Sequence, residues 1–270
     1  MRAGETATGW PSGVGLVRLA EIGSTSAEAF RLAAAGGAGR LWVTAACQTA
    51  GRGRSGRKWL SEHGNLYASH LLWPEAVPST LHQLAFVAGV AVHETVTRAL
   101  AEAEHAGDLR LKWPNDLLLD GAKLGGILTE ASTQGQRTCA VIGIGLNVCH
   151  QPAISGRATT SLAAAGVATS PGRLLPVLAN ALDRWLTIWH EGSGFAAIRA
   201  AWTEHGPPPG QRLTVSDGDH SASSPSPKRR QGRFAGLDGD GALLLADDHG
   251  EISRVTYGDV TLGWMEGDRG

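Results

Sequence analysis

Apolar residues in this chain follow two spacings, and each spacing predicts a different element. Short apolar runs, and runs that alternate with polar residues, have the period of a strand. They predict strands at 16–22, 41–46, 65–73, 110–113, 117–119, 123–130 and 138–147. From 81 to 104 the apolar residues recur at three- and four-residue intervals, which predicts a long helix. We therefore expect an α+β protein whose later strands form a meander.

Capping residues mark where further helices begin. In Ser24-Thr25-Ser26-Ala27-Glu28 a hydroxyl group stands at the cap position and an acid in the first turn. A helix is expected from there to about Ala35. Pro171 in the first turn predicts a helix over 171–190, and a short helix is expected over 195–205.

The composition changes after Gly206-Pro-Pro-Pro-Gly210, which has the character of a stiff linker. Short strands with Gly and Asp turns, the pattern of a small barrel, are expected at 212–215, 232–237, 242–246 and 251–257. The Ser/Pro-rich stretch 217–230 is expected to be disordered, with its basic end simply solvated. The predicted units are a flexible start (1–15), a main domain (16–205) and a small C-terminal domain (206–270).

Composition limits the classes of protein that fit. The 270 residues are 42% hydrophobic, enough for a sizeable core, and the formal net charge is −1. No global field therefore attracts nucleic acid or an anionic membrane. Cys47, Cys139 and Cys149 form no C-x-x-C pair, which favours a reduced, cytoplasmic protein. We find no signal-peptide pattern and no run of about 18 apolar residues, so no membrane span is expected.

The segment Gly51-Arg-Gly-Arg-Ser-Gly-Arg-Lys-Trp59 concentrates chemistry in nine residues. Glycines bring backbone N–H groups close to a ligand, arginines match phosphate or carboxylate oxygens, and Trp59 offers a face for a ring. The loop therefore indicates a wrapper for a ligand that carries both phosphate and a ring, such as a nucleotide.

Three other interpretations fit parts of this loop. Residues 51–56 spell G-x-G-x-x-G, but that fingerprint needs a helix afterwards, and 65–73 has the pattern of a strand. A P-loop would need Lys and Ser/Thr where Arg57 and Lys58 stand. A solvated basic turn without a ligand is the third, and the clustering of glycine with arginine argues against it.

A second constellation is Lys112-Trp-Pro-Asn-Asp116, followed by Lys123-Leu-Gly-Gly-Ile-Leu128. Asp116 is a hard oxygen donor suited to Mg²⁺ beside phosphates. A lysine at the edge of an apolar strand needs an anionic partner to offset its desolvation. For Lys123 that partner is Glu130, Asp116, or the carboxylate or phosphate of a ligand, and spacing alone leaves these alternatives open.

Taken together, these motifs resemble the biotin–protein ligases, in particular the short, monofunctional kind. The resemblance is carried by Ser24-Thr25, the block from Gln48 to Trp59, the two lysine motifs, and Gly143-Ile-Gly-Leu-Asn147. It covers about residues 16–162, and the tail is similar to the family's SH3-like domain. The fold implied is a mixed-sheet, class II synthetase-like catalytic domain with a small SH3-like β-barrel after it.

The resemblance implies an ATP-dependent ligase that uses Mg²⁺. Biotin would be activated as biotinyl-5′-AMP and passed to a lysine of a biotin carboxyl carrier domain of the acetyl-CoA carboxylase type. Its catalytic residues would be Lys123, Arg54 and Asp116, the last also a magnesium ligand. Biotin contacts are expected from Ser24, Thr25, Ser26, Gln48, Arg52, Gly53, Arg54, Lys123 and Gly126. ATP or adenylate contacts are expected from Arg57, Trp59, Lys112, Asn115 and Asn147, with Trp59 covering the adenine.

Departures and rival functions complete the expectations. Ser26 stands where the family usually has Asn, which puts a ligand role at that position in doubt. About 20 residues precede the core, too few for a helix-turn-helix domain, so no DNA binding is expected. Neither zinc nor a membrane is expected, and the protein should be a monomer or weak homodimer. The rivals are a lipoate–protein ligase and a non-catalytic biotin binder; Ser24, Thr25 and Gln48 favour a ureido ring over a dithiolane.

Overall fold

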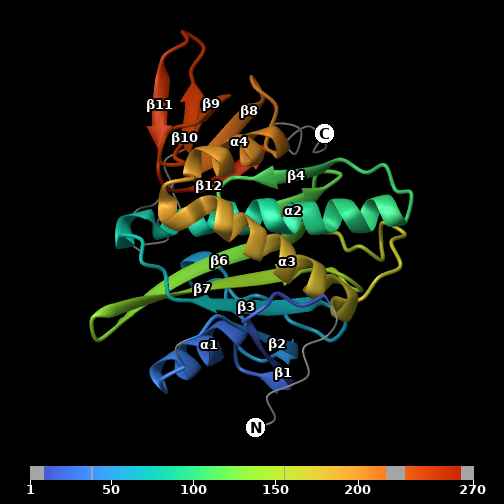
Figure 1. The fold of residues 1–270 in the computed structure, drawn as a ribbon. Coiled ribbons are helices and arrows are strands. Elements are labelled where there is room, and N and C mark those ends of the chain that lie inside the picture. Colours follow the sequence, from blue (N-terminus) through green and yellow to red (C-terminus); the bar gives the residue numbers. More distant parts are fainter. Residues whose placement is uncertain (1–8, 38, 155, 217–228, 263–270) are drawn as a thin grey trace.

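The computed structural model describes residues 9–37, 39–154, 156–216 and 229–262. Two β-sheets and four α-helices make up these residues (Figure 1). The strand and helix pattern expected from the sequence is confirmed throughout the main domain, with most boundaries within a few residues. The division into separate domains stays a prediction, because one apolar core joins residues from both sheets.

The larger sheet has seven strands in the order β1-β2-β3-β7-β6-β5-β4. Only β1 and β2 pair in parallel, and each other neighbouring pair is antiparallel, so the sheet is mixed, as expected. The strands are β1 (Gly15–Ile22), β2 (Leu41–Gln48), β3 (Leu66–Leu72), β4 (Leu109–Lys112), β5 (Asp116–Leu119), β6 (Ala122–Gln134) and β7 (Arg137–Leu146).

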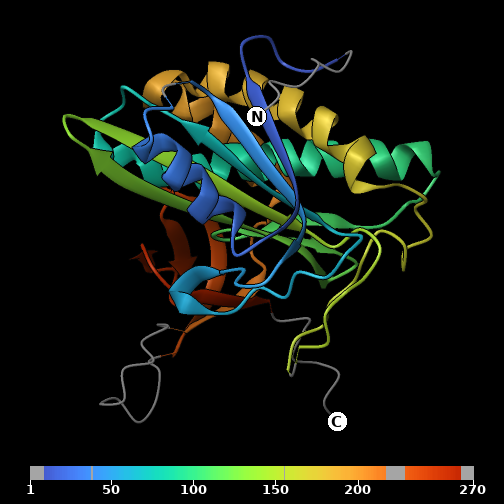
Figure 2. The same cartoon turned by 90° about the horizontal axis from the view of Figure 1, so that it is seen from below.

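Helices cover both faces of this sheet because its strands alternate apolar residues between the two faces. Val43, Leu71 and Val141 pack with α1 (Thr25–Ala34) on one face. The alternate residues of the same strands, among them Trp42 and Leu72, join the larger core on the other face. That core includes α2 (Leu84–Glu102), α3 (Pro171–Trp189) and α4 (Phe195–His205), and Figure 2 shows the layers from below.

The long helix α2 follows a 3₁₀ turn, η2 (Pro78–Gln83). Together they are long and apolar enough to cross a membrane by length and composition, but 72% of the most apolar window is buried inside the protein. Burial against the sheet, α3 and α4 explains the apolar composition, as in the core helix of a globular protein.

The smaller sheet is antiparallel, with the order β11-β10-β9-β8-β12, and stands where a small barrel was expected. Its strands are β8 (Arg212–Ser216), β9 (Arg229–Leu237), β10 (Leu243–Ala246), β11 (Ile252–Val255) and β12 (Asp259–Leu262). β12 was not among the strands predicted from the sequence. This sheet packs onto the larger one: the Trp113 indole donates to the Gly241 carbonyl at 3.1 Å.

Two expectations about irregular ends need correction. Residues 1–8 and 217–228 lie outside the described residues. Of the stretch expected to be flexible, Trp10 packs against the core and Val14 is buried, because both are apolar. Of the stretch expected to be disordered, Arg229 and Arg230 belong to β9, where pairing with β8 satisfies their backbone groups.

Candidate active site

A small cavity, here called the Thr25 cavity, opens on the face of the larger sheet that carries α1. Val141 packs beneath α1, so Gly143 and Gly145, two and four residues further along β7, point to the same side. The start of α1 and the end of β2 close it. Its walls include seven of the predicted biotin contacts: Ser24, Thr25, Ser26, Gln48, Arg52, Lys123 and Gly126.

Buried hydroxyl groups form a network where α1 begins. The Thr25 hydroxyl donates to Oε1 of Gln48 at 3.0 Å and lies 2.8 Å from the Ser69 hydroxyl, which is 3.0 Å from that of Ser26. The carboxamide nitrogen of Gln48 donates to Oγ of Ser61 at 2.9 Å. This network holds the side chains in place for a ligand edge that carries N–H and C=O groups, which cannot be buried unpaired.

The indole of Trp59 occupies much of the Thr25 cavity. It lies over Gly126 and Gly145, which face each other across β6 and β7: a Cβ at Gly145 would come within 2.5 Å of the ring. About 50 Å³ stays free, well below the roughly 300 Å³ or more of ligand pockets. The Trp59 Nε1 is buried without a hydrogen-bond partner among the described residues. The Trp59 ring thus fills the predicted biotin site in this structure, because two glycines leave room for it there. Its contact with adenine stays a prediction, and Trp59 also lines the larger cavity described below.

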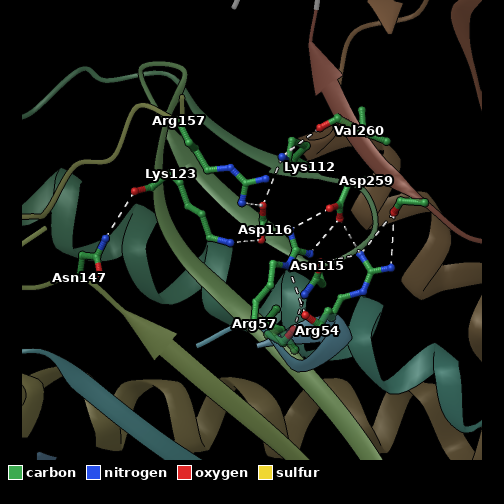
Figure 3. Close-up of polar contacts among 12 residues, drawn as sticks. Arg54, Arg57, Lys112, Asn115, Asp116, Lys123, Asn147, Arg157, Asp259 and Val260 are labelled. Atoms are coloured by element: carbon green, nitrogen blue, oxygen red, sulfur yellow. Dashed lines mark hydrogen bonds and ion pairs between the residues drawn. The ribbon is translucent and has the colours of Figure 1, made fainter. Parts of the chain in front are cut away.

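Asp116 lies at the centre of a buried cluster of charges (Figure 3). Its Oδ1 binds the Lys123 ammonium, and its Oδ2 lies 3.2 Å from the Lys112 ammonium and 3.8 Å from the Arg157 guanidinium. Burial raises the pKa of the Asp116 carboxyl, but the three cations outweigh burial and hold that pKa well below its usual range. Burial likewise lowers the pKa of the Lys123 ammonium, and the Asp116 charge opposes that shift.

The anionic partner of Lys123 is therefore Asp116, one of the alternatives that spacing left open. Glu130, the other candidate side chain, binds Arg52 at 3.1 Å. The Lys123 ammonium also lies 5.3 Å from the centre of the Trp59 ring, within the range of a cation–π contact.

A magnesium site at Asp116 does not fit this geometry. Both of its carboxylate oxygens face cations, and a metal ion would have to displace them. Within the part of the chain that the structure describes, no group of three His, Cys, Asp or Glu side chains gathers to hold a metal. The expectation of Asp116 as a metal ligand is corrected accordingly.

A larger cavity of about 530 Å³, here called the Arg157 cavity, shares the Lys123 and Trp59 walls of the Thr25 cavity. Five cationic side chains line it, but only two carboxylates, those of Asp116 and Asp259. The predicted nucleotide contacts Arg57, Trp59, Asn115 and Asn147 all line it. The excess of positive charge in this cavity suits a polyanion such as a nucleoside triphosphate.

The glycine–arginine loop is fixed to the smaller sheet (Figures 2 and 3). The Arg57 guanidinium binds both carboxylate oxygens of Asp259, at 2.8 and 3.1 Å, and Arg54 lies 3.6 Å from the same carboxylate. Burial raises the pKa of Asp259, and the Arg57 and Arg54 charges more than reverse that shift. Arg54 also donates to the Gly258 carbonyl at 3.4 Å. The loop that closes the site is thus held by β12.

Three predicted contacts lie elsewhere than expected. Gly53 is not on the wall of the Thr25 cavity; its N–H donates to the Arg57 carbonyl at 2.7 Å and shapes the turn of the loop. Arg54 lines the Arg157 cavity instead of the Thr25 cavity, because it reaches toward β12. Lys112 lies behind Asp116, where its ammonium donates to the Val260 carbonyl at 3.1 Å.

Three residues of the site were missed from the sequence. Ser69 had a weak signal, as a polar residue within a strand that is buried along its whole length. Arg157 and Asp259 had none, because each reaches the site from a segment that no motif covers.

A third cavity of about 600 Å³ is here called the Phe86 cavity. It is bounded by η2 and the start of α2 on one side, by the strand β6, and by the turn before β10. Phe86, Trp113 and Leu128 give it apolar walls. Asn115 lines all three cavities, and its Oδ1 accepts from Arg54 at 3.3 Å. The three cavities therefore meet at one point.

A buried ammonium between a polar pocket and a cation-lined cavity is the arrangement expected of a ligase that activates a carboxylic acid with a nucleotide. The profile of the biotin/lipoate A/B protein ligase family matches residues 32–147, and that of the biotin protein ligase C-terminal domain matches residues 228–263. The chain belongs to the biotin protein ligase family.

Individual relatives agree with this assignment. The chain is 38% identical over 234 residues to a biotin–[acetyl-CoA-carboxylase] ligase of Paracoccus denitrificans, covering 84% of this chain and 92% of that protein. It is 31% identical to the bifunctional ligase/repressor BirA of Bacillus subtilis, covering 90% of this chain and 72% of that protein. A solved structure of the Aquifex aeolicus biotin protein ligase in complex with biotin and ATP is similar, with a TM-score of 0.69 and 26% identity, over 92% of this chain and 97% of that one.

Proposed function

We propose that this protein activates biotin with ATP and transfers the biotinyl group to a lysine of a carboxylase carrier domain. The observation that carries the proposal is the position of Lys123, whose ammonium lines both the Thr25 cavity and the Arg157 cavity. Two anions that repel each other have to meet for the first step, and a buried cation between their sites lowers the cost of that meeting.

In the first step a carboxylate oxygen of biotin attacks the α-phosphorus of ATP. A bond forms between that oxygen and the α-phosphorus, which gives biotinyl-5′-AMP. The bond between the α-phosphorus and the oxygen that bridges to the β-phosphorus breaks, and pyrophosphate leaves with the electron pair. In this step the Lys123 ammonium gives up its ion pair with Asp116 and contacts the two reacting anions instead. Asp116 keeps Lys123 in place and charged until then.

The Trp59 indole has to leave the Thr25 cavity before biotin enters, because about 50 Å³ does not hold a bicyclic acid. The loop from Gly51 to Trp59 therefore opens and closes once per turnover. In this structure Arg57 of the loop binds Asp259 while Trp59 fills the Thr25 cavity. Once the indole has withdrawn and the ligands are bound, closure of the loop over them would keep water from the mixed anhydride.

In the second step the neutral acceptor amine attacks the biotinyl carbonyl carbon. The bond from that carbon to the phosphate oxygen breaks, AMP leaves with the electron pair, and the nitrogen gives up one proton to solvent. The Phe86 cavity suits the route of the incoming lysine, since its apolar walls accommodate the stem and it meets the other two cavities at Asn115. Arg54 lies at this end of the cavity, and a nearby cation favours the neutral amine, which is the nucleophile.

Magnesium is assigned to the substrate in this proposal. It would arrive bound to the ATP phosphates and supply additional positive charge there, since Asp116 is already surrounded by cations. A cytoplasmic location agrees with the free state of Cys47, Cys139 and Cys149.

Label transfer tests the proposed function. Purified protein is incubated with ATP, magnesium, an apo carrier domain and radioactive biotin or radioactive lipoate. We expect label from biotin on the carrier, and none after the acceptor lysine is replaced by arginine. Transfer of lipoate instead of biotin would reassign the substrate, and transfer of neither would contradict a ligase function.

A further inference from the structure

The segment that follows Arg157 is bonded to the backbone of Lys123. The Lys123 N–H donates to the Ala158 carbonyl at 2.9 Å, and the Thr160 N–H donates to the Lys123 carbonyl at 3.0 Å. The Asn147 carboxamide donates to the carbonyl of Thr160 at 2.9 Å and ties the same segment to the end of β7. The backbone that follows Arg157 is therefore anchored to the strand that carries Lys123, although the segment is a loop.

The charges around Asp116 exceed what one carboxylate needs. Lys123 and Lys112 are both within hydrogen-bond distance of its oxygens, and Arg157 is a third cation at 3.8 Å. Three cations this close repel one another, and low exposure weakens the screening by water. Asp116 and Asp259, whose pKa the Arg157 charge also helps to lower, balance only part of the positive charge around the cavity, so a further anion can bind there.

Arg157 also faces the cavity from the side opposite the glycine–arginine loop. It lines the Arg157 cavity together with Thr159 and Asn147, whereas Arg54 and Arg57 line it from the loop (Figure 3). About a third of its side chain is exposed, so its guanidinium is accessible to a ligand. A guanidinium binds two phosphate oxygens at once, which a lysine cannot do with the same geometry.

We propose that Arg157 binds the β- and γ-phosphates of ATP and stabilises the pyrophosphate as it leaves. The assignment rests on the proposed function of the site. When the α-phosphorus accepts the carboxylate oxygen, the electron pair of the breaking bond moves onto pyrophosphate, and Arg157 neutralises part of that charge. Arg157 then has no role in the second step, because the adenylate no longer carries the phosphates that it holds.

The alternative is that Arg157 only balances the charge of Asp116. In that case removing the Arg157 side chain would disturb the position of Lys123. Both steps would then slow, because in the proposed function Lys123 contacts biotinyl-5′-AMP, which the first step makes and the second step consumes. The two roles therefore separate by which step depends on Arg157.

The test compares the two half-reactions in the full-length protein. Biotin-dependent exchange of pyrophosphate into ATP reports the first step, and single-turnover transfer from isolated biotinyl-5′-AMP to a carrier domain reports the second. For Arg157→Ala we expect the KM for ATP in the exchange reaction to rise about 10- to 100-fold. The affinity for biotin and the transfer rate should stay within about twofold of the wild type, and Arg157→Lys should recover part of the loss.

A matched control is Arg173→Ala, which removes an exposed arginine of α3; it should leave both half-reactions unchanged. Wild-type protein without exchange activity would overturn the proposed function and this assignment with it. An active wild type whose Arg157→Ala variant keeps its KM for ATP, or loses exchange and transfer equally, would overturn the assignment of Arg157 alone.

Discussion

The Thr25 cavity and the Arg157 cavity share a wall but are built differently. The Thr25 cavity is formed mainly by strands of one sheet and the start of α1, with its hydroxyl groups bonded to one another. The Arg157 cavity is assembled from the glycine–arginine loop, residues 152–154 and 156–159, and the first residue of β12. A pocket for a small rigid acid can be built into a sheet, whereas a cavity for a flexible polyanion is closed around it by cationic side chains.

The largest effect is expected for the residue that both cavities share. Lys123→Ala should slow biotin-dependent pyrophosphate exchange by about 10²- to 10³-fold or more, because the repulsion between the two reacting anions is no longer offset. Lys112 and Arg157 still neutralise Asp116, so the melting temperature should change little. Arg98→Ala on the outer side of α2 serves as the control; exchange at a rate near that of the wild type would disprove the role of Lys123.

Releasing the loop should affect mainly the closed state. Asp259→Ala removes the bidentate partner of Arg57, so biotinyl-5′-AMP should escape into solution about tenfold faster. The half-life of the enzyme-bound adenylate, followed by filter binding, measures this. Asp248→Ala removes an exposed acid of the same sheet that pairs with Arg212, and it should leave the half-life unchanged. An unchanged half-life in Asp259→Ala would show that β12 does not hold the loop.

Changing the hydroxyl network should affect biotin and spare ATP. Thr25→Val leaves the Gln48 and Ser69 side chains without a shared partner, so the KM for biotin should rise about tenfold. The KM for ATP should not change, since Thr25 is not on the wall of the Arg157 cavity. Thr44→Val, which removes a hydroxyl bonded to the Tyr67 carbonyl, is the control. An equal rise in the KM for biotin and the KM for ATP would show that the two cavities do not bind different substrates.

Lowering the pH should reduce the free energy of unfolding through His70, a buried residue of β3. His70 is fully buried against Trp42, and burial lowers its pKa from 6.5 to about 3. Between these values the unfolded state binds more protons, so stability is full above pH 6.5 and falls as the pH drops toward 3. At pH 5 the loss is about 2 kcal/mol. His70→Leu should flatten this part of the stability curve in urea titrations, and the exposed His150→Ala should not. If His70→Leu leaves the dependence of the free energy of unfolding on pH unchanged, the acid sensitivity comes from other groups.

The two cavities also differ in how far the sequence predicts them. Thr25, Gln48 and Gly126 are expected together because their motifs resemble the family's biotin contacts, and the structure brings all three to the wall of one cavity. The contact of Arg57 with Asp259 joins residues about 200 positions apart, and no local pattern encodes it. The sequence does not show that the Trp59 ring would lie over Gly126 and Gly145, because these two glycines become adjacent only when β6 and β7 pair. Asp116 was read as a metal ligand because the sequence does not show that three cations converge on it.

The most direct test of the central claim is the position of one ammonium group in a crystal structure with biotin and a non-hydrolysable ATP analogue. Lys123 Nζ should lie within about 3 Å of both the biotin carboxylate and an α-phosphate oxygen, with Trp59 withdrawn from Gly126 and Gly145. A structure in which both ligands are bound while Lys123 still contacts only Asp116 would contradict the account.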